Sequence, residues 1–145
     1  MIPPFNLDGN LPPGVYSVEW SEVAARFGTN DHRQRLLVGL ADALEQFRIA
    51  GCRRVYIDGS FVTSEPHPND YDVCYEIRGV DPMYLDPVFF DIRPGRAAQK
   101  AKYGGEFFPS SGGAAPGSNF FQFFQIDKQT GKSKGILAIE FRKSP

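Results

Sequence analysis

Two aspartates separated by a single residue are the strongest chemical feature of this sequence. Asp70 and Asp72 stand at the start of YDVCYEI (71–77), in which apolar and polar residues alternate as they do in a strand. Side chains two positions apart on a strand leave the same face, with their α-carbons about 6–7 Å apart. Carboxylates so placed can share a hard cation that prefers oxygen ligands and retains several waters. The pair therefore predicts a site for Mg²⁺ (or Mn²⁺) bound together with a phosphorylated substrate.

A Gly-Ser turn precedes this pair and adds a second element of phosphate chemistry. Gly59 and Ser60 end the strand-like run RRVYIDG (53–59). Glycine lets a backbone approach a phosphate closely, and the serine hydroxyl supplies a donor beside free N–H groups. Taken singly, a Gly-Ser turn or an Asp-x-Asp pair is usually structural. In this order, on successive strands, they favour a site for a triphosphate and a metal ion.

Basic residues later in the chain offer further candidate contacts. If residues 96–103 are helical, Arg96, Lys100 and Tyr103 fall on one stripe that could reach phosphates or stack on a base. A solvated helix face explains the same spacing. Asp58 could join the metal shell, although it could equally hold its own turn by a backbone hydrogen bond.

An amphipathic helix and two strands must position these groups. The helix is predicted over about 31–50, capped by Asn30 or Asp31. Its apolar stripe comprises Leu36, Leu37, Leu40, Leu44 and Phe47, and we place Arg33 and the other charged residues away from that stripe. We expect an α/β (α+β) fold, a mixed sheet with helices packed on one face and the acidic site on the other.

The two ends of the chain carry weaker signals. Residues 1–14 are rich in proline and predict an extended arm, followed by a helix that Ser17 caps and Gly28 ends. Near the other end, 120–126 and 135–141 predict a hairpin. Side chains alternate between the two faces along 135–141, which places Glu140 on the face opposite Leu137 and Ile139.

Composition bounds the class of protein. The 145 residues fit one domain (1–145), and a formal net charge of −1 gives no broad positive field, so we expect no broad DNA binding. No basic stretch followed by an apolar run begins the chain, and no run of about 18 apolar residues occurs. With only Cys52 and Cys74, read as buried thiols, the expected location is cytoplasmic.

The motif spacing resembles a known superfamily. Gly59-Ser60, nine intervening residues and Asp70-Tyr71-Asp72 are similar to the signature of nucleotidyltransferases with the DNA polymerase β-like fold. The stretches MIPPFN, GCRRVYIDGSFVT, RAAQKAKYGGEFFP and KGILAIEF resemble a group of small bacterial proteins placed in that superfamily. The resemblance implies a third carboxylate on a later strand, between apolar residues. Glu140 fits that setting, with Asp91 as the rival.

The resemblance also implies a reaction. A nucleoside monophosphate would pass from a magnesium-nucleoside triphosphate to a hydroxyl of a partner protein or tRNA, as in toxin–antitoxin or phage-defence pairs. Asp70, Asp72 and Glu140 (or Asp91) would hold the metal, and Gly59 and Ser60 the phosphates. Lys100 and Arg96 are further candidates for the nucleotide. A binding module of antitoxin type with the same fold is the alternative, while a phosphodiesterase is disfavoured because a histidine-aspartate cluster is lacking.

Overall fold

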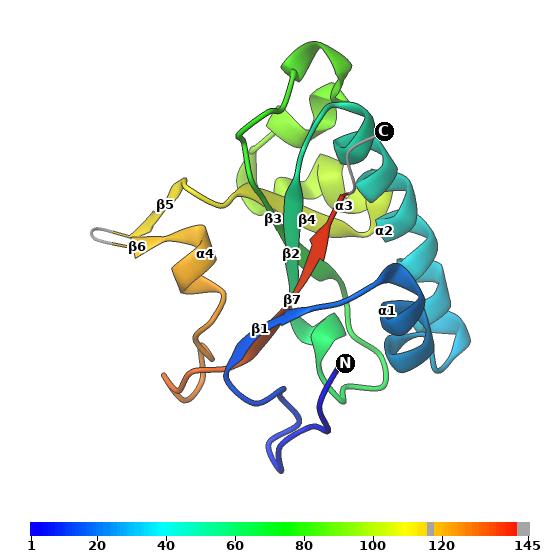
Figure 1. The fold of residues 1–145 in the computed structure, drawn as a ribbon, viewed down its shortest axis with the longest axis vertical. Coiled ribbons are helices and arrows are strands. Elements are labelled where there is room, and N and C mark those ends of the chain that lie inside the picture. Colours follow the sequence, from blue (N-terminus) through cyan, green and yellow to red (C-terminus); the bar gives the residue numbers. More distant parts are fainter. Residues whose placement is uncertain (116–117, 142–145) are drawn as a thin grey trace.

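The computed structural model describes residues 1–115 and 118–141 (Figure 1). The predicted domain span 1–145 therefore includes residues 116–117 and 142–145, which lie outside the described part. The described helices are α1 (Trp20–Phe27), α2 (Asp31–Ile49), α3 (Ala97–Tyr103) and α4 (Phe120–Phe123). The strands are β1 (Gly14–Ser17), β2 (Arg54–Asp58), β3 (Tyr71–Tyr75), β4 (Gly105–Pro109), β5 (Gly113–Ala115), β6 (Ser118–Asn119) and β7 (Gly135–Glu140). Single 3₁₀ turns lie at Ser60–Val62, Pro82–Tyr84, Pro87–Phe90 and Pro94–Arg96.

Five of the strands form one mixed sheet in the order β1-β7-β2-β3-β4, and β5 and β6 pair separately. In the large sheet β2 is antiparallel to both β3 and β7, whereas β4 is parallel to β3 and β1 is parallel to β7. The predicted mixed sheet of an α+β protein is confirmed. Residues that pair across neighbouring strands share a face, so this register decides which side chains can meet.

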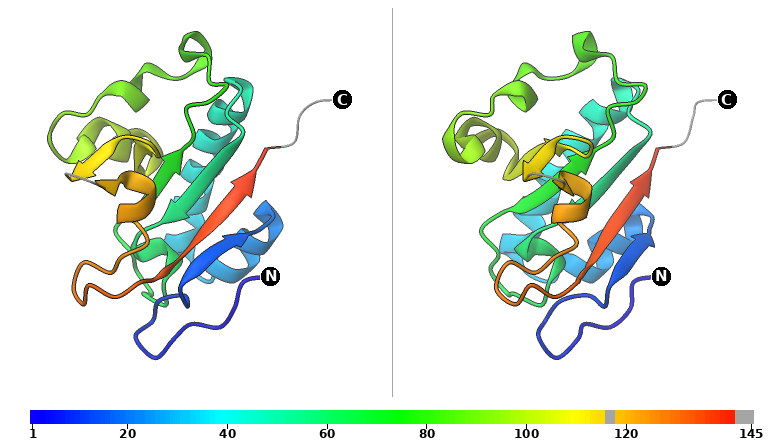
Figure 2. Two further views of the ribbon diagram at one scale, coloured as in Figure 1. Left: turned by 60° about the vertical axis from the view of Figure 1, so that its left-hand side comes forward. Right: turned by 90° about the vertical axis from the view of Figure 1, so that its left-hand side faces the viewer.

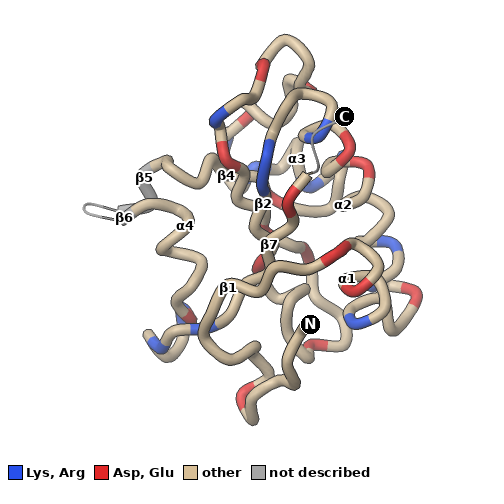
Figure 3. Tube along the Cα trace, viewed as in Figure 1, with Lys and Arg blue, Asp and Glu red and all other residues tan. Residues whose placement is uncertain are grey.

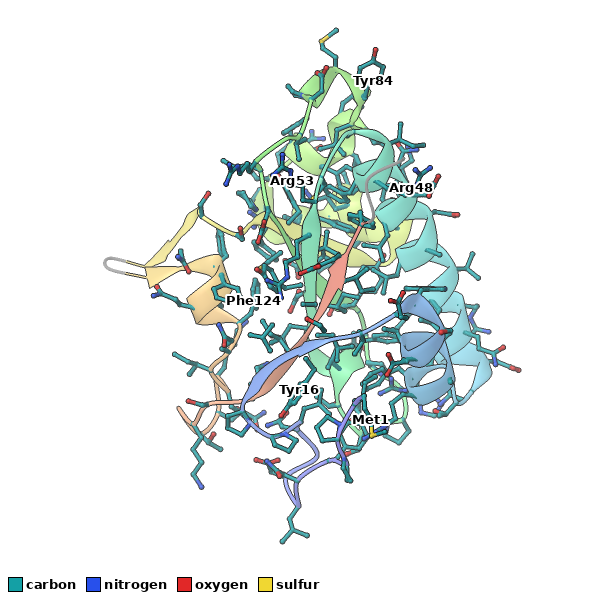
Figure 4. The ribbon with its side chains drawn as sticks, in the orientation of Figure 1. Met1, Tyr16, Arg48, Arg53, Tyr84 and Phe124 are labelled. Carbon is teal, nitrogen blue, oxygen red and sulfur yellow. The ribbon has the colours of Figure 1, made fainter. Side chains whose placement is uncertain are left out.

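The two faces of the sheet are covered differently. Helices α1, α2 and α3 pack on one face, where Val55, Ile57 and Val73 point into the main core. The other face carries a smaller apolar cluster built from Tyr56, Cys74, Phe108, Phe124, Ile136 and Ala138. Figure 2 shows α4 on that second side, and Figure 4 places Phe124 between α4 and the sheet. The prediction of helices on one face only is therefore corrected, because α4 covers part of the face that carries the acids.

The long helix follows the prediction closely. The Asn30 side chain accepts a hydrogen bond from the Arg33 backbone N–H, which caps α2 as expected. The first helix differs, because Glu19 and Glu22 form a capping box and α1 begins at Trp20. The predicted Ser17 cap is therefore wrong, because Ser17 ends the edge strand β1.

The predicted C-terminal hairpin is wrong. Residues 120–126 do not form a strand, because Asn119 and Gln122 make a capping box that starts the short helix α4. The phenylalanines of this segment pack as a helical cluster over Phe108. The strand β7 has no hairpin partner in this segment and pairs instead with β1 and β2, which are far away in the sequence.

Two further observations bear on partners. Within the described residues, no helix combines the length and apolarity needed to span a bilayer. Figure 3 shows basic and acidic positions interspersed along the chain in this view.

Candidate functional site

Three carboxylates lie in a row across adjacent strands. In the sheet register Asp58 on β2 pairs with Asp72 on β3, and Asp72 pairs with Glu106 on β4. Cross-strand partners share one face with β-carbons about 5 Å apart. Asp70 immediately precedes β3, so the chain gathers four acids at one end of the sheet. We call these four residues the acidic cluster; Glu106 was not foreseen.

The acidic cluster is electrostatically costly without cations. Burial raises the pKa of Asp72 to about 7, and repulsion from Asp58, Asp70 and Glu106 adds to the effect. Burial also raises the pKa values of Asp58 and Asp70. A bound cation would relieve both the desolvation and the repulsion. The site is therefore built to favour positive charge.

Two lysines partly supply that charge. Lys100 Nζ lies 3.5 Å from Asp70 Oδ2 and 3.1 Å from Glu106 Oε1. Lys134 Nζ lies 3.1 Å from Asp58 Oδ2, so this buried carboxylate is ion-paired as well. The remaining carboxylate, Asp72, makes no ion pair or hydrogen bond within residues 1–115 and 118–141.

A cleft of about 520 Å³ opens beside Asp58 and Asp72. One wall comes from residues 59–66, which include the Gly59-Ser60 turn. A second wall comes from residues 123–134, which carry Lys128 and Lys134, and residues 8–10 form the rim. Binding clefts for small molecules typically measure about 300–1,000 Å³, so a nucleotide-sized ligand fits this space.

A family model described as a family of unknown function (DUF6932) matches residues 3–140. The chain belongs to the DUF6932 family. No curated protein and no solved structure matches it. The matched range includes all four acids and both walls of the cleft, so the site lies wholly within the DUF6932 part of the chain.

In this DUF6932 chain Gly59 allows the first wall to contact the acidic cluster. Its φ is +90°, a conformation that other residues rarely adopt. A β-carbon built there would lie 3.0 Å from Asp72 Oδ2 and 3.1 Å from the Asp72 backbone nitrogen. The Ser60 hydroxyl donates to the Asp70 carbonyl at 3.4 Å. The turn is thus packed directly on the Asp-x-Asp segment, as its place in the sequence predicted.

A buried arginine fixes the rest of this wall. Arg33 is only 3% exposed, and its guanidinium donates to four backbone carbonyls. Those carbonyls belong to Phe27, Phe61, Thr63 and Glu65. The prediction that Arg33 lies away from the apolar stripe of the helix is wrong. Its spacing, three and four residues before Leu36 and Leu37, is the signal that could have identified a buried position.

The predicted basic stripe is only partly present in the DUF6932 chain. Arg96 precedes α3 in a left-handed conformation, and its guanidinium lies 3.9 Å from the Phe108 ring centroid. Tyr103 is buried, and its hydroxyl donates to Asp86 at 2.7 Å. Of Arg96, Lys100 and Tyr103, only Lys100 contacts the acidic cluster.

The two residues predicted as a third carboxylate lie elsewhere. Glu140 has the predicted parity, but it pairs with Arg54, at the opposite end of β2 from Asp58. Four residues of strand span about 13 Å. Asp91 follows a 3₁₀ turn, is not on a strand, and its carboxylate accepts from Arg93. Glu106, rather than Glu140 or Asp91, therefore lies beside Asp72 in the sheet.

Gly59 provides a prediction for this site. Gly59→Val should abolish binding of magnesium-ATP or magnesium-CTP, because the new side chain displaces Asp72 and strains the backbone. Gly59→Ala should weaken it. Calorimetric titration of protein shown by circular dichroism to be folded provides the measurement.

Gly95 is the matched control, since its φ is +69° and a β-carbon there would meet nothing within 4 Å. Gly95→Val should show backbone strain of about 1–3 kcal/mol without loss of binding. Normal nucleotide binding by folded Gly59→Val would show that the turn does not contact the ligand.

Proposed function

We propose that this protein is a metal-dependent nucleotidyltransferase, which moves a nucleoside monophosphate from a triphosphate to a hydroxyl of a protein or RNA acceptor. One observation carries the proposal. The acids of β2, β3 and β4 form one row, and Asp58 and Asp72 of that row line a cleft whose walls hold a Gly-Ser turn and two lysines. Carboxylates and phosphate-binding groups thus meet in one space of suitable size.

The residues present suit a divalent cation. Asp58 is 3% exposed, and its Oδ2 is ion-paired with Lys134 at 3.1 Å. Across the strands from it, the Asp72 carboxylate makes no ion pair or hydrogen bond within the described residues. No three His, Cys, Asp or Glu side chains of the described chain converge as a complete ligand set. Magnesium is commonly held by one or two carboxylates together with waters and substrate phosphates, so two carboxylates are enough to hold it.

We assign the ion to Asp58 and Asp72, with Asp70 and Glu106 close by. When bound, it would neutralise phosphate charge and polarise the α-phosphorus toward attack. The DUF6932 chain itself supplies the groups that would bind the triphosphate. Lys128 and Lys134 on the second wall would bind the β- and γ-phosphates, and the Gly59-Ser60 turn would approach them through its backbone.

The proposed transfer forms one bond, breaks one bond and moves one proton. The acceptor hydroxyl oxygen forms a bond to the α-phosphorus as the bond to the β-phosphate bridging oxygen breaks and pyrophosphate leaves. A carboxylate of the acidic cluster accepts the hydroxyl proton. Neither His32 nor His67 lines the cleft, so the proton is assigned to a carboxylate.

A binding module is the second candidate function. The segment between β3 and α3 exposes five large apolar side chains, Ile77, Met83, Tyr84, Phe90 and Ile92. Figure 4 shows Tyr84 at the tip of this segment. Apolar exposure of this kind marks surfaces that bind proteins. Partner binding that survives loss of every acid of the cluster would favour this candidate over catalysis.

Glu106 and Glu140 offer a direct test of the proposed function. Glu106→Gln should reduce nucleotidyl transfer about 10- to 100-fold, the usual effect of losing a group beside a metal site. Glu140→Gln should leave transfer unchanged, because it removes only an exposed pair with Arg54 at 3.7 Å. The measurement is transfer from α-labelled ATP or CTP with Mg²⁺ to protein and RNA from a native extract.

Two outcomes decide between the assignments. If Glu140→Gln abolishes transfer while Glu106→Gln is silent, the site lies at the other end of β2. If no magnesium-dependent nucleotide binding occurs in the wild type, the proposed function is wrong.

A further inference from the structure

The loop that carries Lys128 is held together by its own hydrogen bonds. The Asp127 carboxylate accepts from the backbone N–H groups of Gln129 at 2.8 Å and Thr130 at 3.4 Å, as the first residue of a tight turn does. Its backbone N–H donates to the Lys132 carbonyl at 2.8 Å, which closes the turn. Lys128 is exposed inside this turn and lines the cleft. The place of the lysine therefore follows the place of Asp127.

One hydrogen bond joins this turn to a distant part of the chain. Asn10 donates from its side-chain Nδ2 to Asp127 Oδ2 at 2.7 Å, across 117 positions of the sequence. Within the described residues, it is the only hydrogen bond between residues 126–133 and any part of the chain before α4. Hydrogen bonds from Gln129 and then from Asn10 lower the pKa of Asp127, so the aspartate stays ionised as an acceptor.

The backbone around Asn10 is fixed to the opposite wall of the cleft. Asn10 forms an isolated antiparallel bridge with Thr63, and the carbonyl of Gly9 accepts from the Ser64 N–H at 3.0 Å. Figure 2 shows the start of the chain and the loop before β7 at the same end of the molecule. Asn10 thus contacts the first wall through its backbone and the second wall through its side chain.

We propose that the hydrogen bond between Asn10 and Asp127 is a clasp that sets the separation of the two walls and places Lys128 for the triphosphate. The inference rests on the proposed function, in which Lys128 binds a phosphate. Asn10 and Asp127 are positioning residues, since they act on the ligand through the lysine. Because the clasp fixes the loop before the nucleotide arrives, binding does not have to order it.

Asn10→Asp tests the clasp with almost no change in side-chain volume, because it sets a second carboxylate against Asp127. Adding Asp127→Asn restores the clasp with donor and acceptor exchanged, and the double variant has the net charge of the wild type. The measurement is calorimetric titration with magnesium-ATP and magnesium-CTP. Asn10→Asp should raise the Kd about 10-fold, the lower end for loss of a hydrogen bond to a charged group. The double variant should return it to within about twofold of wild type.

Asn6→Asp is the matched control for the added charge. Asn6 is exposed on the same segment and does not line the cleft, so this variant should bind as the wild type does. Hydrogen exchange without nucleotide gives a second measurement, because an open clasp exposes the amides of residues 127–131. Their exchange should be faster in Asn10→Asp, and should match the wild type in the double variant and in Asn6→Asp.

The outcomes separate this inference from the proposed function. Wild-type affinity in Asn10→Asp, or a double variant that binds as weakly as Asn10→Asp, would overturn the clasp while leaving a nucleotide site in place. Unchanged hydrogen exchange in Asn10→Asp would overturn it as well. No binding of either nucleotide by the wild type would overturn both the proposed function and the role of the clasp.

Discussion

Asp72→Asn is expected to abolish nucleotide transfer and at the same time make the protein more stable at pH 8. Loss of a neighbouring group usually costs a metal site about 10- to 100-fold, so loss of a direct ligand should exceed 100-fold. Stability should rise because the ionised Asp72 is buried among three other acids. The two readouts are transfer of labelled nucleotide and the free energy of unfolding in urea.

The pH dependence has a definite sign. The pKa of Asp72 is raised from its ordinary 3.8 to about 7, so the folded protein binds the proton more tightly than the unfolded chain. Protonated Asp72 therefore stabilises the folded state fully below about pH 4, and this contribution is lost as the pH rises through 7. At about 1.4 kcal/mol for each pH unit, Asp72→Asn should gain roughly 4 kcal/mol at pH 8 and nothing at pH 4.

An exposed aspartate on α2, Asp42, is the control. Asp42→Asn should change stability by less than about 0.5 kcal/mol at either pH and leave transfer intact. Stability of Asp72→Asn that is lower than wild type at pH 8 would show that the carboxylate is held by favourable contacts. Transfer at the wild-type rate would remove Asp72 from the site.

Arg33→Met should have the largest effect on stability among changes outside the acidic cluster. Methionine fills much of the same volume but leaves two buried and two partly buried carbonyls without their donor. Removing one partner from a buried polar network costs about 3–5 kcal/mol. For a chain of this size that corresponds to a fall in Tm of roughly 10 °C, measured by scanning calorimetry.

Arg33→Lys should recover little, because one ammonium cannot reproduce the planar set of donors. Arg35→Met, an exposed neighbour on the same helix, should leave Tm within about 2 °C. Magnesium-nucleotide binding by Arg33→Met should weaken as well, since residues 61–65 continue from the Gly59-Ser60 turn. A wild-type Tm for Arg33→Met would mean that the carbonyls find other donors.

The sequence was informative wherever a local period controls the structure. The spacing of leucines located α2, and alternation located β2 and β3 with the correct faces. The Gly-Ser turn and the Asp-x-Asp segment were expected to meet, and they do at Gly59 and Asp72. Each of these features depends on contacts within about twenty residues or on one face of one element.

The missing parts depend on pairing over longer distances. Glu106 enters the site because β4 lies parallel to β3, and a five-residue strand after a helix gives no sign of its partner. Glu140 had the right parity, but parity fixes only the face, not the position along the strand. Arg33 was misplaced because charge was read as exposure, whereas backbone carbonyls can surround a guanidinium.

The place of β7 in the sheet also bears on how the chain acquires its structure during synthesis. This strand is the last one described, yet it lies between β1 and β2 and joins Gly14 to Gly135. Until it is made, β1 has no partner in the large sheet and β2 presents an open edge. Such non-local pairing slows folding and exposes strand edges to other chains. Because Lys134 immediately precedes β7, a nascent chain completes the second wall of its cleft only when this strand inserts.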